Sequence, residues 1–267
     1  MFILRKIKKG DVVGRISYGK DIIFVVDSII NLKNTRVAIL KGLTMRIKAD
    51  SPLDDLEIID KRIAKSSIKN VENRIISHLN KYMNPFRRIN NFGLVLHLDG
   101  DNRYSQKSAR YYRSLGINAV VKSVTESRQP IVMQNLLNKY NPDVLVITGH
   151  DGMIKHNTGF NDLYNYRNSM YFVKSVLAAR RWENYSNKLA IFAGACQSYY
   201  EALIQAGANF ASSPDRILID FIDPLIVAEN IAMTDSRQFV SIKSFENELR
   251  DGQRGISGIG SFGKRKN

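Results

Sequence analysis

The chain has 267 residues, of which 44% are hydrophobic and 9% aromatic, as in ordinary globular proteins. Its formal net charge is +15, and residues 1–90 hold 19 of the 40 Lys and Arg against 9 of the 25 Asp and Glu. The single cysteine excludes an internal disulfide and a cysteine-based zinc site. No apolar run reaches the ~18 residues of a membrane span, and the N-terminus lacks a signal-peptide core. We therefore expect an intracellular protein.

Residues 1–60 are predicted to form a small basic β domain. Short apolar runs at 12–13, 22–26, 36–40 and 57–59 are separated by glycines and by Pro52. The stretch Lys9-Gly10-Asp11-Val12-Val13 resembles the opening of SH3-like β-barrels, which bind nucleic acid or protein. The basic charge predicts an acidic partner here, while a simply solubilising charge excess is the other interpretation.

Residues 61–90 are predicted to be a helical linker. From Lys61 to Asn84 apolar residues recur at helical spacing, and the Asn84-Pro85 pair ends the pattern. His78 falls within this helix and is expected on its surface. The basic stretch that follows Pro85 places a domain boundary near residue 91.

After residue 91 the predicted strands and helices alternate. The strands are 92–98, 117–124, 143–148, 189–193 and 209–211, and the helices are 105–115, 129–140, 169–182, 198–206 and 224–233. This order predicts βαβ units, a mostly parallel sheet and a three-layer α/β/α domain over residues 91–251. Residues 252–267 contain five glycines and end in Lys-Arg-Lys-Asn, so we expect a flexible basic tail.

Cys196 and His150 are the candidate catalytic pair. Each follows an apolar run, Leu189–Ala195 for the cysteine and Asp143–Gly149 for the histidine, and they lie 46 residues apart. In a parallel sheet both side chains emerge at the carboxyl edge, where α/β folds place their sites. A thiol next to a base becomes a nucleophile, so this pair predicts a cysteine peptidase.

Local sequence supports this pair over a buried structural cysteine and an ordinary loop histidine. Small residues precede Cys196, and a helix is expected to begin just after it, with its positive end toward a thiolate. Backbone N–H groups of Asp151, Gly152 and Cys196 are the candidate oxyanion donors. This chemistry requires no metal and no organic cofactor.

The two motifs resemble those of the caspase-like cysteine peptidases. Gly194-Ala195-Cys196 follows His150 at a spacing close to the caspase one, and the resemblance covers residues 91 to about 235. One departure is that Asp151 follows the histidine where that clan has glycine, which leaves the exact oxyanion donor open.

Nearly the whole chain is similar to the sporulation-specific YabG-type proteases of endospore-forming bacteria. The similarity rests on the basic β domain, on residues 148–152 and 193–198, and on the stretch 208–214. It implies a protease that cuts after arginine in spore coat and other sporulation proteins. It also implies production in the mother-cell cytoplasm, with association with the spore coat left open.

Arginine preference requires a carboxylate in the specificity pocket, since a guanidinium pairs best with that group. Asp99, Asp101 and Asp215 all follow predicted strands at the carboxyl edge, and Asp99 is preferred because it directly follows a strand beside the central one. Asp220 and Asp223 are expected to cap the next helix.

The two remaining histidines are weaker candidates. His97 lies within the first strand of the α/β domain and is expected to be a core residue with its hydrogen bonds satisfied. His156 follows the candidate site in a loop and is a possible substrate contact.

Two other functions are open from the sequence. One is a non-enzymatic nucleic-acid- or protein-binding module, made of the basic SH3-like domain and a receiver-like α/β domain. Aromatic residues are too sparse among the basic ones for a base-stacking surface, since residues 1–60 hold only Phe2, Tyr18 and Phe24. The other is a magnesium-dependent phosphoryl-transfer site at Asp99 and Asp101, which leaves Cys196 unexplained.

Overall fold

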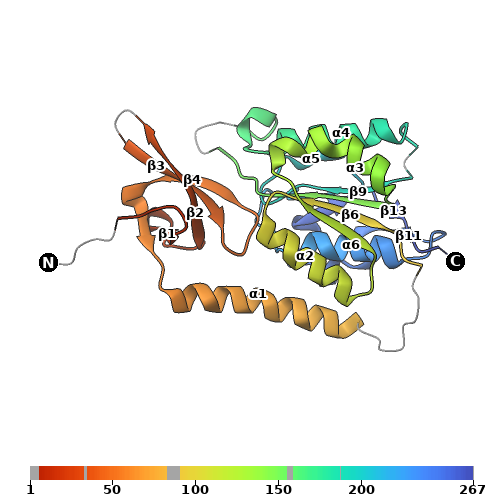
Figure 1. Cartoon of the computed structure of the whole chain (residues 1–267), viewed down its shortest axis with the longest axis horizontal. Helices are drawn as coiled ribbons and strands as arrows, with labels where there is room; N and C mark the ends of the chain where they lie inside the picture. The colour runs from red at the N-terminus through yellow and green to blue at the C-terminus, as the bar shows by residue number, and fades with distance from the viewer. Residues whose placement is uncertain (1–5, 33–34, 83–90, 155–158, 187, 267) are drawn as a thin grey trace.

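The computed structural model describes residues 6–32, 35–82, 91–154, 159–186 and 188–266. An N-terminal β module lies beside a larger α/β part, and helix α1 (Lys61–Tyr82) runs along both (Figure 1). Short 3₁₀ helices complete the connections: η1 (Ile16–Tyr18), η2 (Leu53–Asp55), η3 (Glu126–Arg128), η4 (Leu163–Asn165), η5 (Ile242–Ser244), η6 (Glu246–Glu248) and η7 (Gly252–Arg254).

The N-terminal module is a five-stranded antiparallel sheet of order β4-β3-β2-β1-β5. Its strands are β1 (Val12–Arg15), β2 (Phe24–Leu32), β3 (Thr35–Gly42), β4 (Lys48–Pro52) and β5 (Leu56–Ile58). The sequence did not predict β4, which is a polar edge strand with Pro52 at its end, where a missing N–H costs no ladder bond. The outer strands β4 and β5 do not pair with each other within the described residues, so the predicted barrel closure is not observed.

Helix α1 confirms the predicted linker helix as far as Tyr82, and residues 83–90 lie outside the described residues. The surface position expected for His78 is wrong. Its side chain is buried, and its Nε2 lies 3.0 Å from a carboxylate oxygen of Glu229. Helical spacing alone does not reveal this, because the partner carboxylate is 151 residues away in the chain.

The α/β part is built on a six-stranded sheet of order β12-β10-β9-β8-β6-β7. Its strands are β6 (Val95–Asp99), β7 (Ala119–Ser123), β8 (Val144–Thr148), β9 (Ala190–Ala193), β10 (Phe210–Ser212) and β12 (Ile256–Gly258). The first five are parallel, and β12 pairs antiparallel with β10. The predicted mostly parallel sheet is therefore confirmed.

Helices cover both faces of this sheet (Figure 1). Helices α2 (Asn102–Ser114) and α6 (Asp223–Met233) lie on one face, and α3 (Gln129–Tyr140), α4 (Ser169–Trp182) and α5 (Tyr200–Gln205) on the other. Neighbouring residues of β8 alternate between the two cores: Val144 and Val146 belong to the first, Leu145 and Ile147 to the second. The three-layer prediction is confirmed.

The prediction of a flexible tail at residues 252–267 is wrong where this stretch forms strands. Besides β12, β13 (Ser261–Phe262) pairs with β11 (Phe239–Val240). Gly258 serves close packing, since a Cβ there would lie 2.1 Å from the Asn209 carbonyl oxygen, and Gly260 has a φ of +87°. These glycines thus allow the strands to pack closely. Composition alone does not distinguish this role of glycine from its role in a flexible tail.

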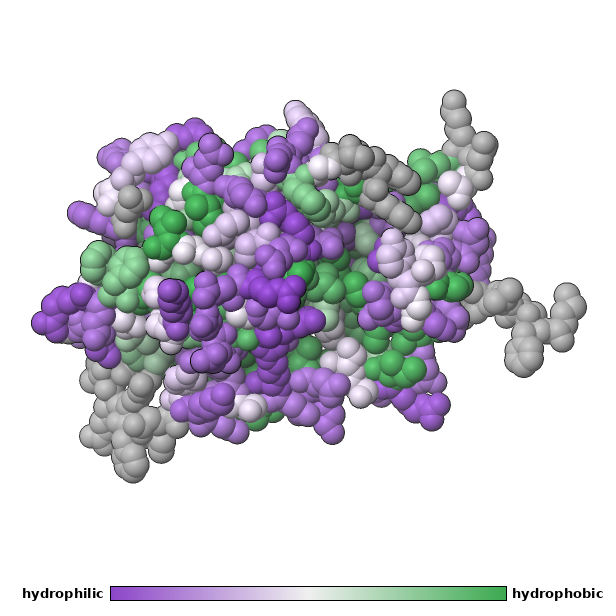
Figure 2. Space-filling view, turned by 180° about the vertical axis from the view of Figure 1, so that it is seen from behind, coloured by the Kyte–Doolittle hydropathy of each residue, from purple (hydrophilic) through white to green (hydrophobic). Residues whose placement is uncertain are grey.

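The surface and the helices bear on the membrane question. Seen from behind in Figure 2, hydrophilic residues are spread widely over the surface, with hydrophobic residues between them. In the part of the chain that the structure describes, every helix is too short or too polar to cross a bilayer.

Candidate active site

Three predicted site residues converge at the carboxyl edge of the sheet. Strands β8 and β9 are parallel neighbours, and His150 and Cys196 follow directly after them. Strand β6 pairs with the other side of β8, so that Asp99 lies opposite Thr148. The chain changes direction across the sheet at the β6–β8 pair, which is where doubly wound sheets form their binding sites.

The backbone of His150 is held on both sides. Its N–H donates to a carboxylate oxygen of Glu126 at 2.7 Å, and its carbonyl oxygen accepts from the Asn168 amide at 2.6 Å. The imidazole lies against the Tyr104 ring, 5.5 Å between centroids, and its two nitrogens make no hydrogen bond to any described residue. Burial lowers the pKa of His150 to about 3, although Asp101 pulls the pKa upward. The ring is therefore neutral at neutral pH.

Cys196 lies in the turn after β9. The turn begins at Gly194, whose φ of +114° requires glycine. The Cys196 Sγ accepts a hydrogen bond from the Ile219 N–H at 3.4 Å, and burial raises the pKa of the thiol to about 12. Helix α5 spans Tyr200–Gln205, within the predicted range 198–206, and begins four residues after Cys196.

The oxyanion candidates differ in what they contact. The Asp151 N–H donates to the carbonyl oxygen of Arg46 at 3.1 Å. The Gly152 N–H donates instead to the side chain of Asp151 at 2.9 Å, and the Cys196 N–H has no acceptor among the described residues. Among the described residues, the Asp151 N–H therefore already binds a carbonyl oxygen, and the Cys196 N–H is left without an acceptor.

The carboxylate of Asp151 is a second feature of this loop, which the sequence did not predict. It is buried and accepts hydroxyl hydrogen bonds from Ser169 at 2.5 Å and from Ser198 at 2.9 Å. It also accepts the backbone N–H of Asn168 at 2.8 Å. Burial raises its pKa to about 6, against the opposing effect of these donors.

Asp99 pairs with a buried guanidinium that comes from the β module. Arg46, from the connection between β3 and β4, is fully buried and forms an ion pair with Asp99. The guanidinium carbon lies 4.7 Å from the ring centroid of Tyr104 and 5.1 Å from that of Phe221. Burial raises the pKa of Asp99, but the charge of Arg46, the contact with His97 and the Asp101 N–H together outweigh burial and keep the pKa well below its usual range.

The Asp99 carboxylate is oriented by two further donors. The Thr148 hydroxyl donates to it at 2.9 Å and the Asp101 N–H at 2.8 Å. A buried carboxylate held in this way presents its remaining acceptor capacity in a fixed direction, as bidentate or charged recognition requires. Nothing in the local sequence around Arg46 indicated that this residue reaches the site, because its partner is 53 residues away.

The other two pocket candidates have different surroundings. Asp101 caps α2 by accepting the Arg103 N–H at 2.8 Å. Asp215 is half exposed and pairs with Arg254 on the surface, 2.9 Å between the nearest atoms. All three predicted aspartates contact a guanidinium: Asp99 that of Arg46, Asp101 that of Arg103 at 3.2 Å, and Asp215 that of Arg254. Only the Arg46–Asp99 pair is fully buried.

The expected caps of α6 form a different arrangement. Asp223 is the first residue of α6, and its carboxylate accepts the Asp220 N–H at 2.9 Å, while Ile222 precedes the helix without a side-chain cap. Both carboxylates pair with Arg74 of α1. They hold the linker helix against the α/β part, so the prediction of simple capping is wrong.

The predictions for the two remaining histidines have different outcomes. His97 is fully buried, with Nδ1 3.1 Å from the Tyr112 hydroxyl and Nε2 2.7 Å from the Thr148 hydroxyl, so the satisfied core histidine is confirmed. His156 lies outside the described residues.

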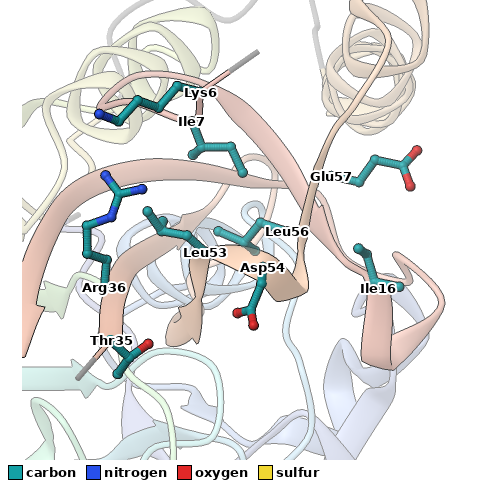
Figure 3. A pocket seen from close by; sticks show the side chains of 9 residues that line it. All are labelled: Lys6, Ile7, Ile16, Thr35, Arg36, Leu53, Asp54, Leu56 and Glu57. Atoms are coloured by element: carbon teal, nitrogen blue, oxygen red, sulfur yellow. The ribbon is translucent and has the colours of Figure 1, made fainter. Parts of the chain in front are cut away.

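A cavity of about 770 Å³ lies on the β module, and Cys196 is not among the residues that line it (Figure 3). Two basic and two acidic side chains line it together with one threonine and four apolar side chains: Lys6, Arg36, Asp54, Glu57, Thr35, Ile7, Ile16, Leu53 and Leu56. This balance does not favour an anionic ligand there.

No group of three or more His, Cys, Asp or Glu residues with metal-site geometry occurs over the described ranges, and Asp99 and Asp101 are engaged in separate contacts.

The chain is similar to known proteins over nearly its whole length. The family model described as YabG peptidase U57 matches residues 8–267. The chain is 35% identical over 274 residues to the sporulation-specific protease YabG of Bacillus subtilis (strain 168), which covers 95% of this chain and 94% of that protein. No solved structure is significantly similar to it.

Proposed function

The chain belongs to the YabG peptidase U57 family, and from this premise we propose that it is a cysteine endopeptidase that cuts sporulation proteins after arginine. The family supplies the peptidase activity, and the name of the Bacillus subtilis relative supplies the link to sporulation. The cysteine mechanism and the arginine preference rest on the residues at the carboxyl edge of the sheet.

In the proposed mechanism, Cys196 is the nucleophile and His150 the general base. His150 takes the thiol proton as Sγ bonds to the carbonyl carbon of the substrate arginine. The backbone N–H groups of Asp151 and Cys196 stabilise the oxyanion. The intermediate then collapses: the C–N bond breaks, and His150 gives its proton to the leaving amine. Water, deprotonated by His150, hydrolyses the thioester and restores the thiol.

The observation that carries the arginine preference is the Arg46–Asp99 pair. The pocket that holds this guanidinium has a carboxylate floor and two aromatic walls, Tyr104 and Phe221. Such walls favour a planar cation over an ammonium, because the guanidinium stacks on the rings while its N–H groups reach the carboxylate. The pocket lies beside His150, whose ring contacts Tyr104. A substrate arginine bound there would bring its carbonyl group to the catalytic pair.

The wider setting follows from the family resemblance. We place the activity in the mother cell of a sporulating bacterium, with spore coat proteins among the substrates. The parallel sheet and the motif spacing support a caspase-like α/β domain over residues 91–251. The β module, residues 1–60, is the candidate for a docking role toward an acidic partner.

Exchange of the pocket carboxylate tests the arginine preference. Asp99→Asn should lower the ratio of kcat/KM for an arginyl peptide to that for the matching norleucyl peptide about 100-fold, since a buried charged pair is lost. Asp215→Asn, on the surface, should leave the ratio unchanged. An unchanged ratio in Asp99→Asn would remove Asp99 from the pocket.

A further inference from the structure

Residues 45–48, here called the inhibitory segment, run through the candidate active site as an added strand. Met45 forms an antiparallel bridge to Asp220, and Ile47 a parallel bridge to Asp151. The Lys48 N–H donates to the Asp151 carbonyl oxygen at 2.7 Å. Extended peptides bind proteins in this way, with backbone hydrogen bonds on their edges and side chains in pockets.

The contacts of Arg46 are those that the proposed function requires of a substrate arginine. Its guanidinium pairs with Asp99, and its carbonyl oxygen accepts the N–H of Asp151, the candidate oxyanion donor. One residue therefore occupies both the specificity pocket and the carbonyl position. A buried structural arginine also needs a carboxylate partner, so the contact between the Arg46 carbonyl oxygen and the candidate oxyanion donor is the one that a substrate specifically requires.

The guanidinium is incompletely satisfied. The Arg46 Nε and Nη2 atoms are buried and make no hydrogen bond to any residue that the structure describes. Burying a charged group with unpaired N–H donors is costly, so this contact is weaker than its ion pair alone suggests. The ion pair thus holds the segment in the pocket, and the unpaired N–H donors lower the free-energy cost of displacing it.

The segment also closes the site to solvent. Cys196 and His150 both have 0% exposure, and Gly152 has room for no side chain because a Cβ there would lie 2.3 Å from the Lys48 carbonyl oxygen. Burial keeps the thiol and the imidazole neutral, with the pKa of Cys196 raised and that of His150 lowered. A substrate cannot reach the thiol while the segment is in place.

The inhibitory segment is the tip of a hairpin and not part of the catalytic layers. It connects β3 to β4, and Tyr104 contributes a hydroxyl hydrogen bond to the Met45 carbonyl oxygen at 3.3 Å. An ion pair between Asp50 of β4 and Arg167 further holds the hairpin to the α/β part. Movement of this hairpin would open the site without disturbing the six-stranded sheet.

We propose that the inhibitory segment is a built-in pseudo-substrate: Arg46 fills the arginine pocket, and substrate binds only after this hairpin withdraws. The inference rests on the proposed arginine pocket. The conformation that can bind substrate is then a minor population of the protein. The apparent affinity for an arginyl ligand is reduced in proportion to the fraction of protein in that conformation.

A binding experiment in an inactive background tests this directly. All proteins carry Cys196→Ala, so that no peptide bond is cut, and the probe is a fluorescein-labelled peptide with one arginine. Fluorescence anisotropy gives its Kd, and the same peptide with norleucine is the reference ligand. We expect Arg46→Ala to strengthen binding of the arginyl peptide at least about tenfold and to leave norleucyl binding weak.

A second variant covers the case in which Arg46→Ala does not fold. Lys48→Pro removes the N–H that bonds to Asp151 and leaves Asp99, Tyr104 and Phe221 unchanged, so it should also strengthen arginyl binding, by a smaller factor. The matched control is Arg36→Ala, an exposed arginine on β3, which should bind like the Cys196→Ala parent.

The outcomes separate the inference from the proposed function. If the arginyl peptide binds better than the norleucyl one but neither Arg46→Ala nor Lys48→Pro strengthens it, the pseudo-substrate is overturned and the arginine pocket stands. If the two peptides bind equally in every variant, the arginine pocket is wrong and the inference falls with it.

Discussion

The Asp151 carboxylate accepts a hydrogen bond from the Ser198 hydroxyl at 2.9 Å, and this contact joins the loop of His150 to the loop of Cys196. The same hydroxyl accepts the N–H of Ala195, the residue before the cysteine, at 2.9 Å. The positions of the imidazole and the thiol are therefore set by one buried bridge between the ends of β8 and β9.

Removing this bridge should destabilise the protein and misplace the catalytic pair. In Ser198→Ala the buried Ala195 N–H loses its acceptor, and we expect a loss of about 1–3 kcal/mol in the free energy of unfolding together with lower peptidase activity. Urea denaturation and arginyl-peptide hydrolysis measure the two effects. Ser175→Ala is the matched control, because the Ser175 hydroxyl is buried but bonded to no described residue, and its loss should be nearly neutral.

The raised pKa of Asp151 predicts a particular pH dependence of stability. Its pKa is about 6 in the folded protein against 3.8 in the unfolded chain, so between these values the folded state binds more protons. Stability from this group is complete below about pH 4 and falls as pH rises through 6, by about 3 kcal/mol. Asp151→Asn should remove this fall.

The measurement is the difference between wild type and Asp151→Asn in urea denaturation from pH 4 to 8. Taking the difference matters because Asp223, with a pKa raised to about 7 by burial and by Asp220, contributes in the same direction. Parallel pH profiles for the two proteins would show that Asp151 is not ionising in this range.

Glu126 is predicted to position His150. Its carboxylate accepts the His150 N–H, and it packs so closely on the turn that a Cβ at Gly149 would lie 2.5 Å from it. Glu126→Ala should lower kcat for an arginyl peptide at least about tenfold, with a smaller change in KM, because a displaced base slows chemistry more than binding. Glu126→Gln, whose amide oxygen still accepts the N–H, should restore most of the rate.

The control for this effect is Glu72→Ala, an exposed glutamate of α1 that pairs only loosely with Lys107. It should behave as wild type. Equal losses in Glu126→Ala and Glu126→Gln would mean that the charge of Glu126, and not its contact with the His150 backbone, supports the rate.

The sequence was informative wherever structure depends on local pattern. Helix α3 spans Gln129–Tyr140 and α4 spans Ser169–Trp182, as predicted, because apolar spacing and Pro130 mark them locally. Cys196, His150 and Asp99 were placed at one edge because parallel strands direct their following residues there.

The missed features depend on contacts between distant residues. Arg46 is one of many basic residues of the β module, and only its pairing with Asp99 separates it from a solvated arginine. His78 is similarly defined by Glu229. The motif Asp151-Gly152 indicated an oxyanion loop, but its use of the aspartate side chain as a bridge to Ser198 requires the tertiary structure.

The C-terminal strands give a further prediction. Gly258→Ala places a methyl group against the Asn209 backbone and should lower the free energy of unfolding by about 1–3 kcal/mol, because β12 must shift away from β10. Ser257→Ala, at the neighbouring position, is the control and should cost less. A neutral Gly258→Ala would mean that β12 contributes little to the sheet.

Replacement of the Cys196 thiol tests the proposed cysteine mechanism. Hydrolysis of an arginyl fluorogenic peptide and of an arginine-containing protein is compared for wild type and Cys196→Ala, and again with Arg46→Ala in both, with the fold checked by circular dichroism. We expect a loss of at least about 1,000-fold on removal of the thiol in either background. Undiminished cleavage by a folded Cys196→Ala protein would contradict the cysteine mechanism.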